Sequence, residues 1–184
     1  MVDEKKWLQA LAESREEARD YYLNSFNWRG RPVPNGFDGP RYYPPAPAWC
    51  VDARLDSDTP GTDMEVELTT SIGDLRLFDL KGTFLFNVAG KEYRLTAYAM
   101  LPRDPDYSYL FVPFRDATSG NETYGGGRYL DVAMTSDDHY ILDFNRAYNP
   151  SCVYSPRYNC PYPPPENSLH FRVEAGEKMP LYGE

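Results

Sequence analysis

Polar residue types that often bind ligands are concentrated in two stretches of this sequence. The first runs from Arg115 to Tyr129 and is rich in Thr, Ser, Asn and Gly, a composition that lets a loop aim backbone N–H groups at a bound molecule. It lacks the Gly-Lys-Ser/Thr ending of a phosphate-binding P-loop, and no helical pattern follows it. The alternative interpretation is a long hairpin connection whose glycines supply positive φ angles.

The second stretch, from Leu142 to Asn167, combines asparagines, tyrosines, prolines and two of the cysteines. Polar and aromatic side chains on loops that a rigid sheet supports are typical of binding sites. The sequence therefore favours a small-molecule-binding β domain, with a pocket between the 115–128 and 145–167 loops and a small polar or anionic ligand. The ligand-binding candidates are Arg128, Asp143, Asn145, Asn149, Glu122, Tyr124, Glu166 and Asn167.

Two other functions stay open. Paired carboxylates can split their pKa values and act as general acid and base, so a second hypothesis is an enzyme with Asp143, Glu122 or Glu166 as the base. The third hypothesis is a protein–protein interaction module, in which Pro161–Pro165 forms a polyproline II stretch or the N-terminal helix mediates dimerisation. The sequence decides neither whether the protein is an enzyme nor its oligomeric state.

The two stretches and the end of the chain contain several distinctive motifs. They are Asp-Phe-Asn-x-Ala-Tyr-Asn-Pro-x-Cys from Asp143, Tyr-x-Cys-Pro at Tyr158–Pro161, Pro-x-Glu-Asn at Pro164–Asn167, Asp-x-Thr-Ser-Gly-x-Glu-Thr-Tyr-x-x-Gly-Arg-Tyr from Asp116, and Ala175-Gly-Glu-Lys178. Through these motifs the sequence resembles domain-of-unknown-function family 1684, a family of uncharacterised bacterial and archaeal proteins. The resemblance covers most of the chain, from about Tyr43 to Lys178. The family implies no activity, because it carries none that could be transferred.

Strand geometry gives one sharper prediction. If residues 127–133 and 138–145 form a hairpin with an even-numbered loop, side chains of opposed residues share a face. We then predict a direct Arg128–Asp143 pair with Asn145 near it on the same face. This pair is either a structural ion pair that pins the hairpin or an anchored arginine that binds an anionic or carbonyl-bearing ligand. The opposed pairs would be Val132–His139, Leu130–Ile141 and Arg128–Asp143.

The cysteines and histidines argue against a metal site. Structural zinc sites usually need two Cys-x2–4-Cys pairs, or one such pair with histidines. The chain has three cysteines and two histidines without that spacing, so we predict neither a metal nor a cofactor. Cys152 and Cys160 are either two packed thiols or a disulfide across a Pro-rich loop, and the sequence leaves their redox state open.

The charge of the chain restricts its partners. The net charge is −9 and the sequence contains no run of Lys and Arg, so nucleic acid and anionic membrane surfaces are disfavoured. No apolar stretch of about 18 residues suggests a membrane-spanning helix, and Met1–Lys6 lacks the apolar core of a signal peptide. We therefore expect a cytoplasmic protein.

The elements that would position these residues follow from periodicity. Residues 3–24 show a helical apolar stripe that includes Trp7 and Leu11, with Asp3 as N-cap. Residues 25–48 form a Pro/Gly-rich covering arm, 49–145 hold the strands, and 146–184 hold an irregular loop, a short strand and a tail. The predicted strands include Leu75–Leu80, Thr83–Ala89, Glu92–Leu101, Tyr109–Phe114, Gly127–Ala133, His139–Asn145 and Leu169–Val173.

Short strands at this spacing, separated by Gly- and Pro-containing turns, indicate an antiparallel barrel or sandwich. The predicted fold is mostly β, with one N-terminal α-helix and long Pro/Tyr-rich loops. A length of 184 residues suits a single domain over 1–184.

Overall fold

The chain begins with a helix whose polar cap and apolar stripe are both visible in the sequence. In the computed structural model, helix α1 spans Glu4–Asp20, and one π-helical turn, Tyr21–Ser25, continues it. The carboxylate of Asp3 accepts a hydrogen bond from the N–H of Lys6 at 3.3 Å, which satisfies one of the free donors at the helix start. The structure describes residues 3–28, 30–101, 108–135 and 139–182.

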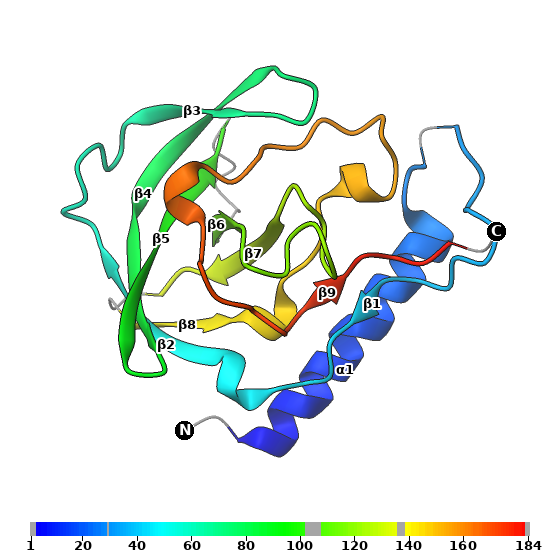
Figure 1. Ribbon diagram of the computed structural model, residues 1–184, viewed down its shortest axis with the longest axis horizontal. Helices are drawn as coiled ribbons and strands as arrows, with labels where there is room; N and C mark the ends of the chain where they lie inside the picture. Colours follow the sequence, from blue (N-terminus) through cyan, green and yellow to red (C-terminus); the bar gives the residue numbers. More distant parts are fainter. Residues whose placement is uncertain (1–2, 29, 102–107, 136–138, 183–184) are drawn as a thin grey trace.

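The strands form one curled antiparallel sheet, which gives the protein its mostly β, barrel-like fold (Figure 1). The sheet has seven strands in the order β7-β6-β5-β4-β2-β8, with β3 paired on β4. A separate two-stranded sheet joins β1 (Arg41–Tyr42) to β9 (Glu177–Lys178) beside α1. The strands of the large sheet are β2 (Cys50–Asp56), β3 (Glu65–Thr69), β4 (Leu75–Val88), β5 (Lys91–Met100), β6 (Tyr109–Phe114), β7 (Arg128–Ala133) and β8 (His139–Asp143).

The inward-facing side chains of these strands fill the barrel. Alternate residues of β6 and β7 are buried there, as the period-two pattern predicts. Burial of large apolar side chains of this kind supplies the main driving force for folding. The barrel core includes Phe84, Phe86, Leu95, Leu110, Val112, Phe114, Leu130, Val132 and Leu142.

Strand β4 continues through Lys81 and Gly82, where the sequence predicted a break between two strands. The register with β5 shifts between Leu80 and Gly82, which marks a β-bulge. Gly82 has a φ of +136°, and a Cβ on it would lie 2.6 Å from the carbonyl oxygen of Asp56. Glycine is therefore required here by a close strand approach and not by a chain-reversing turn.

The bulge exchanges the two faces of β4. Before it, Phe78 packs on the outer face of the sheet, and after it Phe84 and Phe86 point into the barrel. One strand therefore contributes to two apolar clusters. The second, called here the outer-face cluster, comprises Leu68, Phe78, Tyr98, Phe111, Tyr129 and Cys160.

The predicted hairpin of residues 127–133 and 138–145 is wrong. Strand β7 pairs with β6 and strand β8 pairs with β2, so neither strand has the other as its ladder partner. The reason is that β7 returns antiparallel to β6, while β8 pairs with β2 at the opposite edge of the sheet. The observed partners are Leu110–Val132, Val112–Leu130, Phe114–Arg128, Arg54–His139, Asp52–Ile141 and Cys50–Asp143.

The segment Leu169–Val173 does not form the predicted strand. It lies along the loop after β6, where the N–H of Leu169 donates to the carbonyl of Arg115 at 2.8 Å. The N–H of Val173 instead donates to the carboxylate of Asp116 at 2.7 Å. A side chain therefore takes the place of the backbone partner that a strand would need.

Residues 25–48 cover the domain as a packed arm. Two short elements interrupt it, strand β1 and the 3-10 turn Pro47–Trp49. Its aromatic rings contact Tyr154, whose ring is tilted against that of Tyr22 at the helix end, with 4.1 Å between the ring centroids. The arm cluster comprises Tyr22, Phe26, Trp28, Phe37 and Tyr154.

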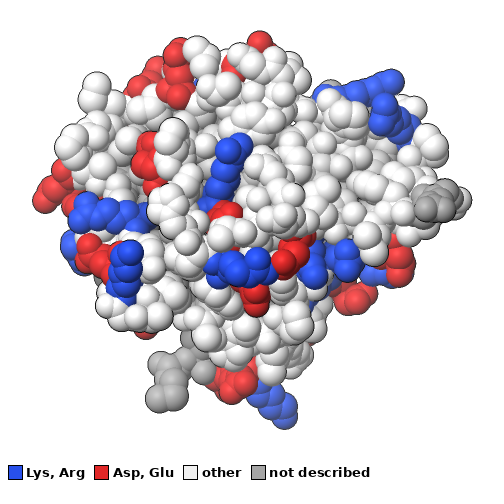
Figure 2. Space-filling view, viewed as in Figure 1, with Lys and Arg blue, Asp and Glu red and all other residues white. Residues whose placement is uncertain are grey.

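Figure 2 shows that basic and acidic side chains are interspersed on one face of the molecule.

Candidate functional site

One of the larger hollows lies on the outer face of the sheet and is called here the outer-face pocket. Its volume is about 440 Å³, and the rings of Phe78, Phe111 and Tyr129 contribute to its wall. The loop after β8 covers it with Tyr148 and Tyr158. A hollow of about 560 Å³ crosses β2, β4 and β8, but it is an open trough. The outer-face pocket combines an aromatic wall with a few polar groups, which is typical of a binding cavity.

Two arginines bring positive charge to this pocket. Arg76 on β4 is half-buried in its wall and donates one hydrogen bond, from Nη2 to the carbonyl of Asn159 at 3.0 Å. Arg157 is exposed and belongs to the same lining. A guanidinium carries five N–H donors, so the bond from Arg76 leaves further donor capacity beside the aromatic wall.

A pair of thiols lies at the pocket, and one of them, Cys160, is part of its lining. The N–H of Cys152 donates to the Sγ of Cys160 at 3.3 Å, and all three cysteines of the chain are free thiols. Hydrogen bonding from Cys160 lowers the pKa of Cys152 to about 7. The Sγ of Cys152 also lies 3.8 Å from the phenol oxygen of Tyr124. The 115–128 and 145–167 loops therefore meet at this contact.

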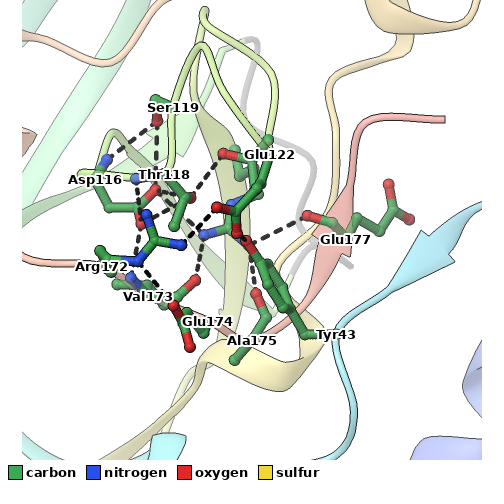
Figure 3. A network of polar contacts seen from close by, with 12 residues as sticks. Tyr43, Asp116, Thr118, Ser119, Glu122, Arg172, Val173, Glu174, Ala175 and Glu177 are labelled. Atoms are coloured by element: carbon green, nitrogen blue, oxygen red, sulfur yellow. Dashed lines mark hydrogen bonds and ion pairs between the residues drawn. The ribbon is translucent and has the colours of Figure 1, made fainter.

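Arg128, predicted to pair with Asp143, pairs instead with Asp116 at 3.3 Å. Figure 3 shows Asp116 close to Val173 and Ala175 of the C-terminal segment. The guanidinium of Arg128 donates to the backbone carbonyls of Val173 at 2.9 Å, of Glu177 at 3.2 Å and of Ala175. The side chain is fully buried, so Arg128 fastens the C-terminal segment over the end of the barrel.

Glu122 belongs to a surface network that Figure 3 also shows. Its two carboxylate oxygens accept hydrogen bonds from the hydroxyl of Tyr43 and from Nη2 of Arg172, both at 2.6 Å. The bond from Tyr43 is the main reason that the pKa of Glu122 is lowered. Glu122 thus joins the arm to the C-terminal segment.

Three of the predicted ligand-binding asparagines are buried amides that bond to backbone. The side-chain carbonyl of Asn145 accepts a hydrogen bond from the N–H of Ala46 in the arm at 2.8 Å, and its side-chain N–H donates to the carbonyl of Ala46 at 2.9 Å. Asn167 holds Thr96 in the same way, at 2.7 and 2.8 Å, and donates a further bond to the carbonyl of Pro113. It therefore fills a gap between β5 and β6. Asn149 donates from its side chain to the carbonyl of Lys178.

The three candidate bases lie in different surroundings. Asp143 accepts a hydrogen bond from the indole N–H of Trp7 at 2.8 Å and pairs with Arg146 at 3.4 Å. Glu122 lies in the surface network, and Glu166 lines a separate pocket together with Arg94. The three carboxylates therefore have no shared set of neighbours that would support paired acid/base chemistry.

Glu177 is the acidic residue that the sequence reasoning missed. It is 2% exposed, and its carboxylate accepts hydrogen bonds from the N–H of Asn149 and the hydroxyl of Tyr154, both at 2.8 Å. Burial raises its pKa to about 7. Its presence in the closing Ala-Gly-Glu-Lys motif was the one available signal. A carboxyl group with this pKa can donate or accept a proton near neutral pH.

Within the part of the chain that the structure describes, no three His, Cys, Asp or Glu side chains come together as a set that could hold a metal ion. Among the same residues, no helix is both long and apolar enough to cross a bilayer.

These features define a mostly β protein with a nearly closed antiparallel barrel, a single N-terminal helix, and Pro/Tyr-rich loops folded over the sheet. The chain belongs to the family described as protein of unknown function DUF1684, whose model matches residues 35–178. This confirms the resemblance seen in the sequence motifs.

A solved structure shares the fold. The solution NMR structure of an uncharacterized protein from Haloarcula marismortui is 32% identical to this chain, with a TM-score of 0.72 and coverage of 96% of each chain. A search of the curated proteins finds no match to the chain.

Proposed function

We propose that the protein binds a small molecule with an apolar or aromatic body and an acidic group in the outer-face pocket. One observation carries the proposal: the half-buried guanidinium of Arg76 stands beside an aromatic wall formed by Phe78 and Phe111 in a cavity of about 440 Å³. Known ligand pockets have volumes of roughly 300–1,000 Å³ and combine an apolar lining with a few polar groups.

The proposal keeps the ligand class that the sequence favours and moves the site. Arg76 takes the role of anchor that was expected of Arg128, because Arg128 is buried against backbone carbonyls. The 145–167 loop supplies Tyr148 and Tyr158 as cover, while Tyr124 stands behind the pocket against Cys152.

We propose neither nucleic acid nor a membrane surface as a partner. The net charge of −9 and the interspersed charges in Figure 2 support this, because both partners carry negative charge. A cytoplasmic location is also part of the proposal, and the three free thiols support it.

The aromatic sulfonate 8-anilinonaphthalene-1-sulfonate tests the site, because it combines an aromatic body with a fixed negative charge. Its fluorescence should rise saturably with the wild-type protein. Arg76→Gln should weaken binding about tenfold, the loss expected for one charge-assisted contact. Arg94→Gln is the matched control, since Arg94 pairs with Glu92 on the surface. Equal losses in both variants would contradict the proposal.

A second pair of variants tests the location without removing charge. Met100 lines the pocket and is 40% exposed, so Met100→Trp should narrow the entrance and reduce binding. Met64 is 62% exposed and outside the pocket lining, so Met64→Trp should leave binding unchanged. The uncharged probe N-phenyl-1-naphthylamine should respond to Met100→Trp and not to Arg76→Gln. If Met100→Trp binds the sulfonate as the wild type does, the pocket is not the site.

A further inference from the structure

Cys152 and Cys160 are two neighbouring thiols that the proposed ligand site does not use. A side-chain hydrogen bond joins them, and the N–H of Cys152 donates to the Sγ of Cys160 at 3.3 Å. The sulfur of Cys160 therefore lies against both the thiol and the backbone of Cys152. Two cysteines can form a disulfide only when their side chains approach each other closely, and these contacts provide that proximity.

The backbone holds Cys160 in place. Its N–H donates to the hydroxyl of Ser71 at 3.1 Å, and its carbonyl accepts a hydrogen bond from the N–H of Ser71 at 2.8 Å. Ser71 lies in the turn between β3 and β4, so Cys160 is tied to the large sheet. Cys152 belongs to the 3-10 turn Ser151–Val153 of the loop that covers the outer-face pocket. A disulfide would therefore close residues 152–160 into a ring anchored on the sheet.

Cys152 is the more reactive of the two thiols. Hydrogen bonds from Cys160, Tyr124 and Ser71 lower the pKa of Cys152 to about 7, although burial opposes them. About half of the molecules therefore carry a Cys152 thiolate at neutral pH. The hydrogen bond to Cys152, burial and the charge on Cys152 raise the pKa of Cys160, so Cys160 keeps its proton. A thiolate beside a thiol is the arrangement of a redox-sensitive cysteine and its resolving partner.

Space open to solvent adjoins both residues. Cys152 is half-buried, and Cys160 is part of the lining of the outer-face pocket. Hydrogen peroxide is little larger than water, so a pocket of about 440 Å³ admits it. Disulfides in a reducing compartment are usually transient and redox-sensing, so the free thiols of this structure are compatible with a disulfide that forms only on oxidation.

We propose that Cys152 and Cys160 form a reversible disulfide when the protein meets a hydroperoxide. The Sγ thiolate of Cys152 attacks a peroxide oxygen, so that an S–O bond forms and the O–O bond breaks. With hydrogen peroxide, the leaving hydroxide takes up a proton to give water, and Cys152 becomes a sulfenic acid.

The second step uses Cys160. Conversion of Cys152 to a neutral sulfenic acid removes the charge that raises the pKa of Cys160, so Cys160 can release its proton. Its Sγ attacks the Sγ of Cys152, the S–S bond forms and the S–O bond breaks, and the departing hydroxide takes the proton to leave as a second water. The two sulfurs lose two electrons, which reduce the peroxide. Neither step needs a bound ligand, so this proposal does not depend on the function proposed above.

Thiol counting measures the disulfide. Folded wild-type protein is treated with hydrogen peroxide at pH 7, unfolded, and labelled with N-ethylmaleimide. The three cysteines should take three labels before oxidation and one afterwards, on Cys50, and peptide mass spectrometry should find Cys152 joined to Cys160. Dithiothreitol should restore all three labels. Three labels after oxidation, or a disulfide that contains Cys50, would overturn the proposal, whether or not the outer-face pocket binds the sulfonate.

Variants separate the roles of the two sulfurs. Cys160→Ser removes the resolving thiol, so Cys152 should stop at the sulfenic acid, which dimedone traps, and excess peroxide should carry it to the irreversible sulfinic acid. Cys152→Ser should slow the oxidation of Cys160 at least about tenfold, because an ordinary thiol is mostly protonated at neutral pH. Cys50→Ser is the matched control and should form the disulfide at the wild-type rate. Equal rates of Cys160 oxidation in Cys152→Ser and wild type would refute the proposal.

Discussion

Replacing Glu177 with glutamine should change how the stability of the protein depends on pH. The carboxyl group is buried, and burial raises its pKa from the usual 4.5 to about 7. Glutamine has nearly the same shape and stays neutral, and its carbonyl can accept the hydrogen bonds from Asn149 and Tyr154. Arg128, Arg15 and Tyr42 also face this group.

The size of the effect follows from proton linkage. Below pH 4.5 the carboxyl group is protonated in both the folded and the unfolded chain. Between pH 4.5 and about 7 only the folded chain holds the proton, so the free energy of unfolding falls as pH rises through this window. Each pH unit is worth 1.36 kcal/mol, which gives a loss of about 3 kcal/mol in total. Above the folded pKa no further loss occurs.

Urea denaturation of the wild type and of Glu177→Gln at a series of pH values measures this effect. The difference in unfolding free energy, variant minus wild type, should increase by about 3 kcal/mol from pH 4.5 to above pH 8. Contributions from groups present in both proteins, such as Glu122, cancel in this difference. A difference that stays constant across the range would refute the reasoning about Glu177.

Two further predictions concern the loops that meet near the outer-face pocket. A Cβ on Gly126 would overlap the ring of Tyr124, whereas a Cβ on Gly125 would have its nearest neighbour at 3.5 Å. Thermal denaturation should therefore show that Gly126→Ala is destabilised by about 2 kcal/mol and that the stability of Gly125→Ala is nearly unchanged. Equal losses of stability in the two variants would contradict this packing. The pKa of Cys152 is lowered to about 7 and burial raises that of Cys50 to about 12. Iodoacetamide at neutral pH should therefore alkylate Cys152 first, as peptide mass spectrometry would detect; earlier modification of Cys50 would show the thiol assignment to be wrong.

Local patterns in the sequence predicted much of the fold. The helical spacing of Trp7 and Leu11 is set by burial of one face of the helix, so it can be recognised without knowing which residues pack against it. The barrel-like class followed from the number and spacing of strands.

Strand partners could not be predicted in the same way. Alternation in β7 and β8 reports which side chains are buried but not which strand lies alongside, because any antiparallel neighbour satisfies the same pattern. The bulge at Gly82 was missed for a related reason, since a glycine in a turn and a glycine under a crossing strand look alike in sequence.

The candidate site was predicted in part. The two loops meet, at Tyr124 and Cys152, but Arg128 and the predicted asparagines are buried. Their partners are backbone carbonyls and N–H groups of distant segments, and backbone groups leave no signature in a sequence. Arg76 lies within a regular strand, where a charged residue normally indicates a solvent-facing position.

The bulge in β4 makes the outer-face pocket depend on the barrel. Phe78 in the pocket wall and Phe84 in the barrel are on opposite faces only because one extra residue is inserted between them. Deleting Lys81 would reverse the two faces of one half of the strand, so that either Phe78 leaves the pocket wall or Phe84 leaves the barrel core. The pocket and the barrel should therefore unfold together, and a ligand that presses on Phe78 acts on the same rigid strand that supports the core.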